Sequence, residues 1–590
     1  VEECIYGGGI CGYNDNNGTI TGCTNEEKVT VNGNRSSEGG GICGESYGGT
    51  IRDCINRGNV SVESTNADVD AGGICGSNRG FIENCSSQGD IMAIGDNWTY
   101  AGGVCGSNYD GNVITCSSQG NITCIVKGDD ASRAGGICGI NRGNITDCSS
   151  QGNIKAGSKG TITAGGICGY NNEEGNVTNC TSQGNVTAQG EEDSNVGGIS
   201  GSNAGKITNC SSQGNIKAVG ITEAYAGGVC GENYGEKEIT NCSSQGDIMA
   251  ESNEKAYAGG ICGYNTAPWG DETVIPIITS CISNGNITAS GTGECYCGGV
   301  SGYNHKNGII QDCYFMKIDG LDGIGKNDGS ETQGIEPKQA ESFSSGEVAW
   351  LLNHEQEPHQ WVQKLGSEKM PRPIMAEEDA QDDVVLVTAE FPNEVKETEL
   401  YYANVDCSLL DYPGKENGTY YVFFQEPSFT TPLDIHTEAY HQDRTIYAKK
   451  GIAVTKIVLD RENESLYIGE TVKLLANVTP SDASNLALHW SSSDSTVAEV
   501  DQEGTVKALK PGTAIITVEA SDGQGAKAQC TVTIRKKSSS GGGSPSYYYI
   551  TFDTNGGEEM EKLMKLEQSD IDMDEYIPEK EGYVFVGWYR

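Results

Sequence analysis

Short aliphatic segments recur along the first 320 residues, each bounded by Gly, Asn or Ser. The heptapeptide GGICGYN at Gly8–Asn14 returns in variants such as GGVCGSN and GGISGSN. A second segment ends in Cys, as in Thr19–Cys23, and a third reads SSQGNI, as at Ser211–Ile216. The position after GGI or GGV is 11, 43, 75, 105, 138, 168, 200, 230, 262 or 301, so the chain contains ten units.

These segments predict short strands. Each is three to six residues long, rich in β-branched residues and interrupted by Gly, so none is long enough for an α-helix. One unit cannot bury its Ile and Val residues alone, whereas stacked units can. The pattern therefore predicts a mainly β chain whose residues 1–320 form a right-handed parallel β-solenoid. We expect about ten turns, three strands per turn and a rod about 50 Å long.

The polar positions agree with stacked turns. Asn lies three residues after the first Cys or Ser in nine of the ten units. Stacking places like residues above like, so these side chains can exchange amide hydrogen bonds between turns. A structural ladder is favoured over a ligand-binding role for Asn14, Asn78, Asn108, Asn141, Asn171, Asn203, Asn233, Asn265 and Asn304.

The chain has 24 Cys, and most belong to two repeated positions, as in the pair Cys11 and Cys23. Disulfides within each turn, metal ligation and stacked buried thiols are the alternatives. Ser200 and Ser301 replace the first Cys while the second Cys remains, which favours free or partly bridged thiols. The lone CxC at Cys295–Cys297 is a poor metal motif, so we expect no metal site.

The array GGICGYN…GTITGC…GNVTA resembles the GLUG-type repeat of bacterial surface and secreted proteins, including the flanks of some immunoglobulin A peptidases. The resemblance covers about residues 1–320 and implies no catalytic residues. The family more often has an aliphatic residue where this chain has the first Cys of each unit.

Residues 321–375 are expected to form a linker and a capping helix. Phe343–Asn353 has a helical apolar stripe behind a Ser cap, and Trp361 and Leu365 continue the helical spacing. This helix would close the open end of the solenoid. Residues 376–451 alternate as strands of a small β module, most clearly at Tyr420–Phe424.

Residues 452–535 contain seven predicted strands in about 85 residues, which is typical of a β-sandwich with Trp490 at its centre. Cys530 has no partner cysteine there, so an antibody-type disulfide is excluded. The stretch TVKLLANVTPSDASNLALHWSSSDSTVAEVDQEGTVKALKPGTAIITV resembles the group 2 bacterial Ig-like domain. That family is found in adhesins and other surface proteins.

The segment at 536–546 reads KKSSSGGGSPS, a flexible linker. Residues 547–590 then contain ITFDTNGG and GYVFVGWY, which resemble the two ends of a Listeria–Bacteroides (internalin B-type) repeat. This repeat reads as truncated at Arg590, and Val1 is preceded by no signal peptide. We therefore interpret the chain as a fragment of a longer polypeptide.

Composition narrows the function. The net charge of −43 disfavours nucleic acid and anionic lipid as partners. No stretch approaches 18 continuous apolar residues, so we expect no membrane insertion within the chain. Gly reaches 83 of 590 residues and hydrophobic residues only 36%, which suits quasi-one-dimensional repeats rather than one large core.

No enzyme motif is present. His354 and His359 are five residues apart, and Pro358 interrupts any helix that would present both to a zinc ion. The segment Gly201–Lys206 is one residue short of a phosphate loop and is explained by the repeat. We expect no catalytic residues, no cofactor and no turnover by this chain.

Two functions remain. The first is a non-catalytic, monomeric protein of the bacterial cell surface or cell wall, secreted or displayed, that binds a host surface protein or glycan. The second is an accessory region of a large surface peptidase or glycosidase whose catalytic domain lies elsewhere. A glycan-binding solenoid would use aromatic platforms, but these do not form one ladder in the pattern, which favours scattered packing. The candidates are Tyr13, Trp98, Tyr170, Tyr264 and Trp269.

Overall fold

The computed structural model describes residues 4–268, 271, 273–329, 331–354, 358–391, 398–404, 421–431, 433, 442–522 and 525–536, with backbone alone at 331, 377–378, 399, 401, 547–550 and 563–566. The chain divides into two compact units, residues 1–450 and 451–590. Each unit is described by itself below.

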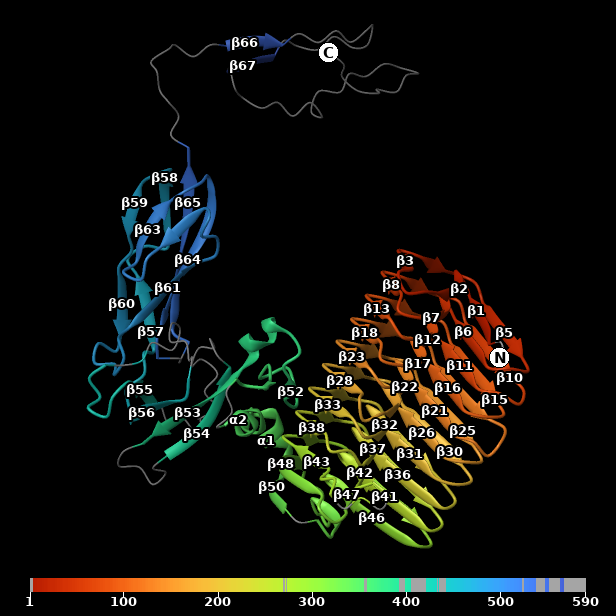
Figure 1. Ribbon diagram of the computed structural model, residues 1–590. Helices are drawn as coiled ribbons and strands as arrows, with labels where there is room; N and C mark the ends of the chain where they lie inside the picture. Colours follow the sequence, from red (N-terminus) through yellow and green to blue (C-terminus); the bar gives the residue numbers. More distant parts are fainter. Residues whose placement is uncertain are drawn as a thin grey trace, which may run out of the picture. The chain divides into compact units, whose positions relative to one another are not determined.

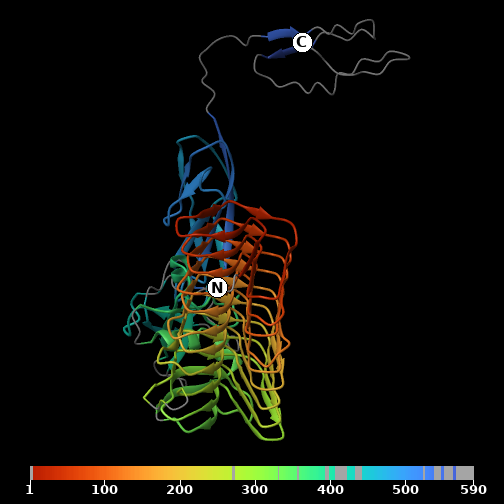
Figure 2. The same cartoon turned by 45° about the vertical axis from the view of Figure 1, so that its right-hand side comes forward.

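The repeat array forms a parallel β-solenoid of about ten turns, as expected from the sequence (Figures 1 and 2). Each turn, or rung, contributes strands to four parallel sheets, which we number in chain order. The strands of the first sheet are β1 (Ile5–Gly8), β6 (Ser37–Gly40), β11 (Val69–Gly72), β16 (Thr99–Gly102), β21 (Ser132–Gly135), β26 (Ile162–Gly165), β31 (Ser194–Gly197), β36 (Glu223–Gly227), β41 (Lys255–Gly259) and β46 (Glu294–Gly298).

The second sheet follows a glycine corner in each rung. Its strands are β2 (Cys11–Asn14), β7 (Cys43–Ser46), β12 (Cys75–Asn78), β17 (Cys105–Asn108), β22 (Cys138–Asn141), β27 (Cys168–Asn171), β32 (Ser200–Asn203), β37 (Cys230–Asn233), β42 (Cys262–Asn265), β47 (Ser301–Asn304) and β49 (Ile324–Asn327).

The third sheet takes two very short strands from most rungs. They are β3 (Thr19–Thr21), β4 (Thr24–Asn25), β8 (Thr50–Arg52), β9 (Ile55–Asn56), β13 (Phe81–Glu83), β14 (Ser86–Ser87), β18 (Asn112–Ile114), β19 (Ser117–Ser118), β23 (Asn144–Thr146), β24 (Ser149–Ser150), β28 (Asn176–Thr178), β29 (Thr181–Ser182), β33 (Lys206–Thr208), β34 (Ser211–Ser212), β38 (Ile239–Thr240), β39 (Ser243–Ser244), β43 (Ile277–Thr279), β44 (Ile282–Ser283), β48 (Ile309–Met316) and β50 (Glu331–Lys338).

The fourth sheet completes each rung. Its strands are β5 (Val29–Gly33), β10 (Val60–Ser64), β15 (Ile91–Gly95), β20 (Ile122–Val126), β25 (Ile154–Ser158), β30 (Val186–Gly190), β35 (Ile216–Val219), β40 (Ile248–Ser252) and β45 (Ile287–Gly291).

The expectation of three strands per turn is wrong. The rung from Ser132 to Ser158, for example, passes through β21, β22, β23, β24 and β25 before the next rung begins at Ile162. The expected third segment, as at Ser211–Ile216, spans the second short strand of the third sheet and the first residue of the fourth-sheet strand, and the first-sheet strand was missed altogether. Its sequence in β21, Ser-Arg-Ala-Gly, is small and polar, and it forms a strand because the neighbouring rungs supply its hydrogen-bonding partners.

Two separate cores run along the solenoid. One is lined by Ile, Val and Cys of the second and third sheets, and the other by Val, Ile and Ala of the first and fourth sheets. They are divided by the Gly-Gly corner between the first two sheets. A Cβ atom on Gly135 would lie 1.9 Å from the Cys138 carbonyl oxygen, and one on Gly136 would lie 2.1 Å from the Gly166 carbonyl oxygen. Only glycine permits the chain to fold back this closely.

The asparagine ladder is confirmed. Asn141 Nδ2 donates to Asn171 Oδ1 at 2.9 Å, and Asn108 Nδ2 donates to Asn141 Oδ1 at 2.8 Å. The same bond continues through the following rungs to Asn304. Each amide also binds the backbone of its own turn, as when Asn141 Nδ2 donates to the Gly143 carbonyl. The ladder therefore ties successive rungs together and fixes the turn after the second sheet.

The cysteines of the solenoid form two buried stacks, and every cysteine in the described part of the chain is a free thiol. Sulfur contacts run between rungs, as between the Sγ atoms of Cys105 and Cys138, 3.0 Å apart. In the second stack the amide of Cys54 donates to the sulfur of Cys85. Burial raises the pKa of the Cys148 and Cys180 thiols well above their usual value, so these thiols stay protonated and unreactive.

The expected capping helix is two shorter helices, α1 (Ala340–Ser344) and α2 (Glu347–Asn353). Gly346, at φ +94°, separates them and caps α2 in place of the expected serine. Trp361 does not continue the helix but begins β51 (Trp361–Val362), which pairs with β52 (Arg372–Pro373). The apolar faces of both helices pack against Ile282 and Tyr314 of the last two rungs. The same cluster contains Phe343, Val348, Leu352, Trp361 and Met370.

After a 3-10 turn at Glu377–Asp382, the small β module forms one sheet in the order β54, β53, β56, β55. Trp350 Nε1 of α2 donates to the Asp443 carboxylate, which links this module to the helices. The bounds are β53 (Val384–Glu390), β54 (Thr398–Asn404), β55 (Tyr421–Phe424) and β56 (Arg444–Lys450).

The second unit holds the expected β-sandwich. Trp490 is 4% exposed at its centre, and the free Cys530 is buried beside it in the same core. A final pair, β66 (Tyr547–Ile550) and β67 (Leu563–Leu566), lies in the predicted repeat, and the rest of 547–590 is outside the described residues. The sandwich strands are β57 (Lys456–Leu459), β58 (Asn463–Tyr467), β59 (Thr471–Lys473), β60 (Ala476–Thr479), β61 (Leu488–Ser492), β62 (Ala498–Val500), β63 (Thr505–Ala508), β64 (Gly512–Ala520) and β65 (Lys527–Arg535).

Removing one ladder amide should destabilise the solenoid. In Asn141→Ala, buried donors and acceptors on two rungs lose their partners, which costs about 2–3 kcal/mol. We expect a lower urea midpoint, followed by circular dichroism. Asn153→Ala is the matched control, because Asn153 bonds to Asn121 in an exposed ladder. Equal shifts for the two variants would contradict a central role for the buried ladder.

The thiols should be reduced and hidden. Titration of the unfolded chain without reductant should find close to 24 reactive thiols, the number in the sequence. In native buffer only a few should react quickly, since partial exposure is confined to the ends of the array in the described cysteines. A titre near zero in denaturant would instead demonstrate disulfides.

Candidate functional site

The outward faces of the first two sheets form the two walls of a groove, because the glycine corner folds one strand back against the other. One outward position per strand lines each wall. The first groove ladder, in register order, is Tyr6, Glu38, Asp70, Tyr100, Arg133, Thr163, Asn195, Tyr225, Tyr257 and Tyr296. The second groove ladder is Tyr13, Glu45, Ser77, Ser107, Ile140, Tyr170, Ser202, Glu232, Tyr264 and Tyr303.

The two ladders touch across the groove. The rings of Tyr6 and Tyr13 lie 5.5 Å apart, and those of Tyr225 and Tyr264 lie 5.1 Å apart. Asn195 Nδ2 donates to Ser202 Oγ at 3.0 Å. The two ladders are thus in contact along the groove, and members such as Ser107 and Ile140 are fully buried between the two sheets.

The solenoid's tyrosines are concentrated here. Every tyrosine in residues 4–320 except Tyr314 lies on a groove ladder or at the position just after the asparagine ladder. The expectation that the aromatics are scattered is therefore wrong: Tyr13, Tyr170 and Tyr264 share one ladder, and Trp98 lies beside Tyr100 with ring centroids 6.5 Å apart. Trp269 lies outside the described residues.

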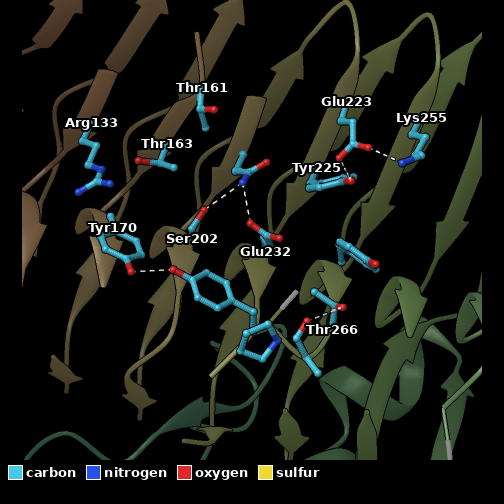
Figure 3. A pocket seen from close by; sticks show the side chains of 15 residues that line it. Arg133, Thr161, Thr163, Tyr170, Ser202, Glu223, Tyr225, Glu232, Lys255 and Thr266 are labelled. Carbon is cyan, nitrogen blue, oxygen red and sulfur yellow. Dashed lines mark hydrogen bonds and ion pairs between the residues drawn. The ribbon is translucent and has the colours of Figure 1, made fainter. Parts of the chain in front are cut away.

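A pocket of about 480 Å³ opens in the groove between the fifth and ninth rungs (Figure 3). This is within the volume range of natural small-ligand sites. Arg133 lies at one end, and Glu223 with Lys255 lies at the other (Figure 3). The remaining lining residues are Thr161, Thr163, Tyr170, Asn195, Ser202, Tyr225, Glu232, Tyr234, Tyr264, Thr266, Ala267 and Pro268.

The middle of the pocket offers unused hydrogen-bonding atoms. Asn195 is 5% exposed and donates to Glu232 Oε2 at 2.9 Å, but its Oδ1 atom has no partner. Thr163 is 6% exposed, and its hydroxyl has no partner either. Buried polar atoms are rarely left without a hydrogen bond. Buried serine hydroxyls of the third sheet, such as Ser150 Oγ, also have no partner, so such atoms alone do not mark a site. The two in the pocket differ because their residues line a cavity that a polar ligand could fill.

Tyrosines provide flat surfaces beside these atoms. Tyr170 and Tyr234 stack with an interplanar angle of 13°, and their hydroxyls are hydrogen-bonded at 2.7 Å. At the far end, Tyr225 stacks on Tyr257 at 11°. The Glu223 carboxylate accepts from the Tyr225 hydroxyl and pairs with Lys255. Aromatic faces next to polar atoms are suited to sugar rings and other amphipathic ligands.

Carboxylates give the groove its acidic character. Burial, together with the nearby Glu223 and Asp193 carboxylates, raises the pKa of Glu232 to about 7. Nearer the first rung, Glu45 and Asp70 are each 7% exposed. Burial and neighbouring carboxylates raise the pKa of Glu38 and Asp70 as well. Among the described residues, the basic side chain that pairs with the acidic stretch of Glu38, Glu45 and Asp70 is Arg79, whose Nε atom lies 3.7 Å from Glu45 Oε1.

The other candidates from the sequence give no site. Helix α2 ends at Asn353, so His354 and His359 share no helix face, and His359 Nδ1 lies 2.7 Å from Asp383 Oδ2. No group of three His, Cys, Asp or Glu suited to a metal ion occurs among the described residues. Gly201–Lys206 spans β32 and the start of β33, as the repeat explanation requires.

Sequence reasoning missed the groove because it missed the first-sheet strand. The available signal was the segment before each GGI or GGV, which reads x-Ala-Gly-Gly in TYAGGVC, SRAGGIC and AYAGGVC. Its x position is the first groove ladder. Alternation of that position with a small inward residue indicates a strand, even without β-branched residues.

Comparison with known families agrees with the three resemblances. Residues 453–532 match the bacterial Ig-like domain (group 2), and residues 548–590 match the Listeria-Bacteroides repeat domain. The GLUG motif matches at 3–31, 130–155 and 192–217. These modules are of non-catalytic types. The Ig-like and Listeria-Bacteroides domains are typical of surface or extracellular proteins. Among the described helices, none has the length and apolar character to cross a membrane.

Curated relatives share only short stretches with the chain. An uncharacterized protein of Clostridium acetobutylicum is 42% identical over 95 residues, which is 16% of this chain and 10% of that protein. An alpha-L-arabinofuranosidase of Bifidobacterium longum is 48% identical over 65 residues, 11% of this chain and 6% of that enzyme. A lacto-N-biosidase of Bifidobacterium bifidum is 42% identical over 69 residues, which is 12% of this chain and 6% of that enzyme.

Stability should fall as the groove carboxyls ionise. The folded chain holds the Glu232 proton up to a pKa of about 7, whereas the unfolded chain releases it near 4.5. Its contribution is therefore present below about pH 4.5 and lost as pH rises through about 7, by at most about 3 kcal/mol. Urea midpoints measured from pH 5 to 8 should decline, and Glu232→Gln should make the decline shallower.

Glu174→Gln is the matched control, because Glu174 is an exposed carboxyl away from the groove lining. It should leave the slope of midpoint against pH unchanged. A Glu232→Gln slope identical to that of the unmodified chain would contradict the buried, proton-holding state of this carboxyl.

Proposed function

We propose that this chain is a non-catalytic extracellular region of a bacterial surface or secreted protein and that it binds a glycan in the solenoid groove. The observation that carries the proposal is the pocket, where stacked tyrosines lie beside two buried polar atoms without partners, Thr163 Oγ1 and Asn195 Oδ1. The Ig-like and terminal modules would then place this groove on the host or matrix side of the bacterium.

The groove fits a sugar polymer better than a compact ligand. Its ladders repeat at about 4.8 Å, so an extended chain can contact several rungs at once. Sugar rings present apolar faces to tyrosine and hydroxyls to amide, hydroxyl and carboxylate groups. Weak contacts at several rungs add up when one molecule spans them. A host protein with an extended segment is the competing ligand, and the binding assay below separates it.

The residue types in the groove support binding rather than turnover. Ser202 Oγ accepts a hydrogen bond from Asn195, and among the described residues no hydrogen bond joins it to the Glu232 carboxyl on the next rung, unlike an activated nucleophile. The cysteine thiols of the solenoid are buried in the core on the opposite side of the sheets. Glu232 and Asp70, whose carboxyls have a raised pKa, are the groups that could act as acid or base. The turnover assay below therefore includes a variant of each.

The second candidate, an accessory region of a larger glycosidase, is favoured by one observation. Three of the curated relatives are named as glycosidases, although each shares only about 65–70 residues with this chain. Sequencing the complete gene tests this candidate. A glycosidase domain in the same polypeptide would support it, and its absence would leave a stand-alone binding protein.

Glycan binding should depend on groove tyrosines. Tyr234→Ala removes a stacking surface and the hydroxyl bonded to Tyr170, and we expect about tenfold weaker binding to the best glycan of an array. Phe81→Ala is the matched control, since Phe81 is a 51% exposed aromatic on the third sheet. Equal losses in both variants, or binding only to proteins, would contradict the groove as a glycan site.

The chain should also leave glycans and peptides intact. Incubation with glycosidase and protease substrate panels should release no product above the level of heat-denatured chain. Release that Glu232→Gln or Asp70→Asn abolishes would overturn the non-catalytic assignment.

A further inference from the structure

Arg133 carries a charge that nothing in the described part of the chain neutralises. Its guanidinium lies 4.4 Å from the ring centre of Tyr170, 4.8 Å from that of Trp98 and 5.6 Å from that of Tyr100. It makes no ion pair there, and its Nε atom is buried without a hydrogen-bond partner. Arg79, at the position just after the asparagine ladder, approaches the Glu45 carboxylate instead.

The three rings hold this guanidinium in place. Cation–π contacts stabilise the charge and restrict the side chain. They leave the N–H groups, which point outward in the plane of the guanidinium, without hydrogen-bond acceptors. A guanidinium fixed in this way is suited to a planar carboxylate, which it can bind through two parallel hydrogen bonds. Because the side chain is already ordered, little conformational entropy is lost when the anion binds.

The two rungs after Arg133 add polar side chains next to the guanidinium. Thr163 and Asn195 follow Arg133 on the first groove ladder, and both have unpartnered polar atoms and are more than nine-tenths buried. Tyr170 forms the facing wall (Figure 3). One end of the pocket therefore offers a cation, the middle offers hydroxyl and amide oxygen atoms, and the wall is aromatic.

We propose that the pocket selects an acidic sugar, with the carboxylate of the sugar bound by Arg133 and its ring hydroxyls bound by Thr163 and Asn195. This inference rests on the proposed function and names the ligand class for the same groove. The shared chemistry is a ring-borne carboxylate, which uronic acids and sialic acids both provide.

The acidic net charge of the chain does not oppose a single carboxylate at this point. Of the two carboxyls in the pocket lining, Glu223 lies at the other end and is paired with Lys255 (Figure 3). Glu232 lies in the middle, where it accepts a hydrogen bond from Asn195, and burial raises its pKa to about 7, which lowers its negative charge near neutral pH. The nearest acidic member of the first groove ladder, Asp70, is two rungs away, or about 10 Å, close to the Debye length at physiological salt. Arg133 is thus the charged side chain at its end of the pocket lining (Figure 3).

A purely structural role for Arg133, joining aromatic rings of three rungs, is the competing explanation. It predicts that loss of Arg133 weakens the binding of acidic and neutral glycans by the same factor, through a distorted groove. A carboxylate-binding role predicts a much larger loss of affinity for acidic glycans than for neutral ones. The comparison between matched ligands therefore separates the two roles.

The test is calorimetric titration of the whole 590-residue chain with two matched ligand pairs. One pair is a glucuronic-acid-containing oligosaccharide and its carboxyl-reduced counterpart, and the other is sialyllactose and lactose. We expect at least one acidic ligand to bind about tenfold more tightly than its neutral partner, and this ratio to shrink in high salt. The pair that shows the ratio identifies the kind of acidic sugar.

Variants then assign the effect to the guanidinium. Arg133→Gln should remove the acidic preference, because the acidic ligand loses much more affinity than the neutral one. Arg133→Lys should keep the preference only in part because lysine lacks the planar fork. Arg142→Gln is the matched control, since Arg142 also stacks on a tyrosine, Tyr109, but lies outside the pocket lining. It should keep the acidic preference intact.

Each outcome is decisive. Equal binding of acidic and neutral partners by the unmodified chain, or an unchanged preference in Arg133→Gln, would overturn the acidic-sugar inference while leaving glycan binding in the groove. Binding of none of the array glycans would overturn the proposed function itself. If Arg133→Gln fails to fold by circular dichroism, the ratio measured on the unmodified chain still decides.

Discussion

The close approach of backbone at the Gly-Gly corner is the constraint on which the solenoid and its groove depend. At Gly135 and Gly136, any side chain would collide with the carbonyl oxygens of Cys138 and Gly166. Because the chain can fold back there, each rung encloses two narrow cores instead of one wide one. A chain with few large hydrophobic residues can fill such cores with Ala, Val, Ile and Cys. The same fold-back brings two outward faces together as the walls of the groove.

Repetition separates structural from functional positions within a single chain. The inward positions of the second and third sheets are Cys, Ile or Val on nearly every rung, and the asparagine ladder is almost unbroken. The groove ladders instead change from Glu and Asp through Arg, Thr and Asn to Tyr. The scaffold is uniform because every rung must stack on the next. The groove can vary because its side chains point away from the two cores in which every rung must stack.

The sequence predicted those parts of the fold that depend on period alone. Identical residues at a constant spacing lie above one another, so the Asn141 ladder and the cysteine stacks followed directly from the repeat. Trp490 was likewise expected in the sandwich core and is 4% exposed. The helix at Phe343–Asn353 was only partly right, because Gly346 adopts a left-handed conformation and divides it.

The candidate site could not be predicted in the same way. Arg133 and Tyr170 are separated by the glycine corner and by one rung, and their contact depends on the angle at which the chain folds back. The repeat period predicts which residues lie above one another, but it does not predict which faces of neighbouring sheets meet. Small polar strands such as Ser132–Gly135 also lack the β-branched signal on which the strand prediction relied.

The most direct test of the central claim is a crystal structure of the chain with a bound oligosaccharide. The account predicts density for the sugar between the two groove ladders, over the rungs that carry Arg133, Thr163, Asn195 and Tyr225, with a ring against Tyr170 or Tyr234. A sugar bound instead on the third or fourth sheet, or on the Ig-like domain, with the groove empty, would contradict it.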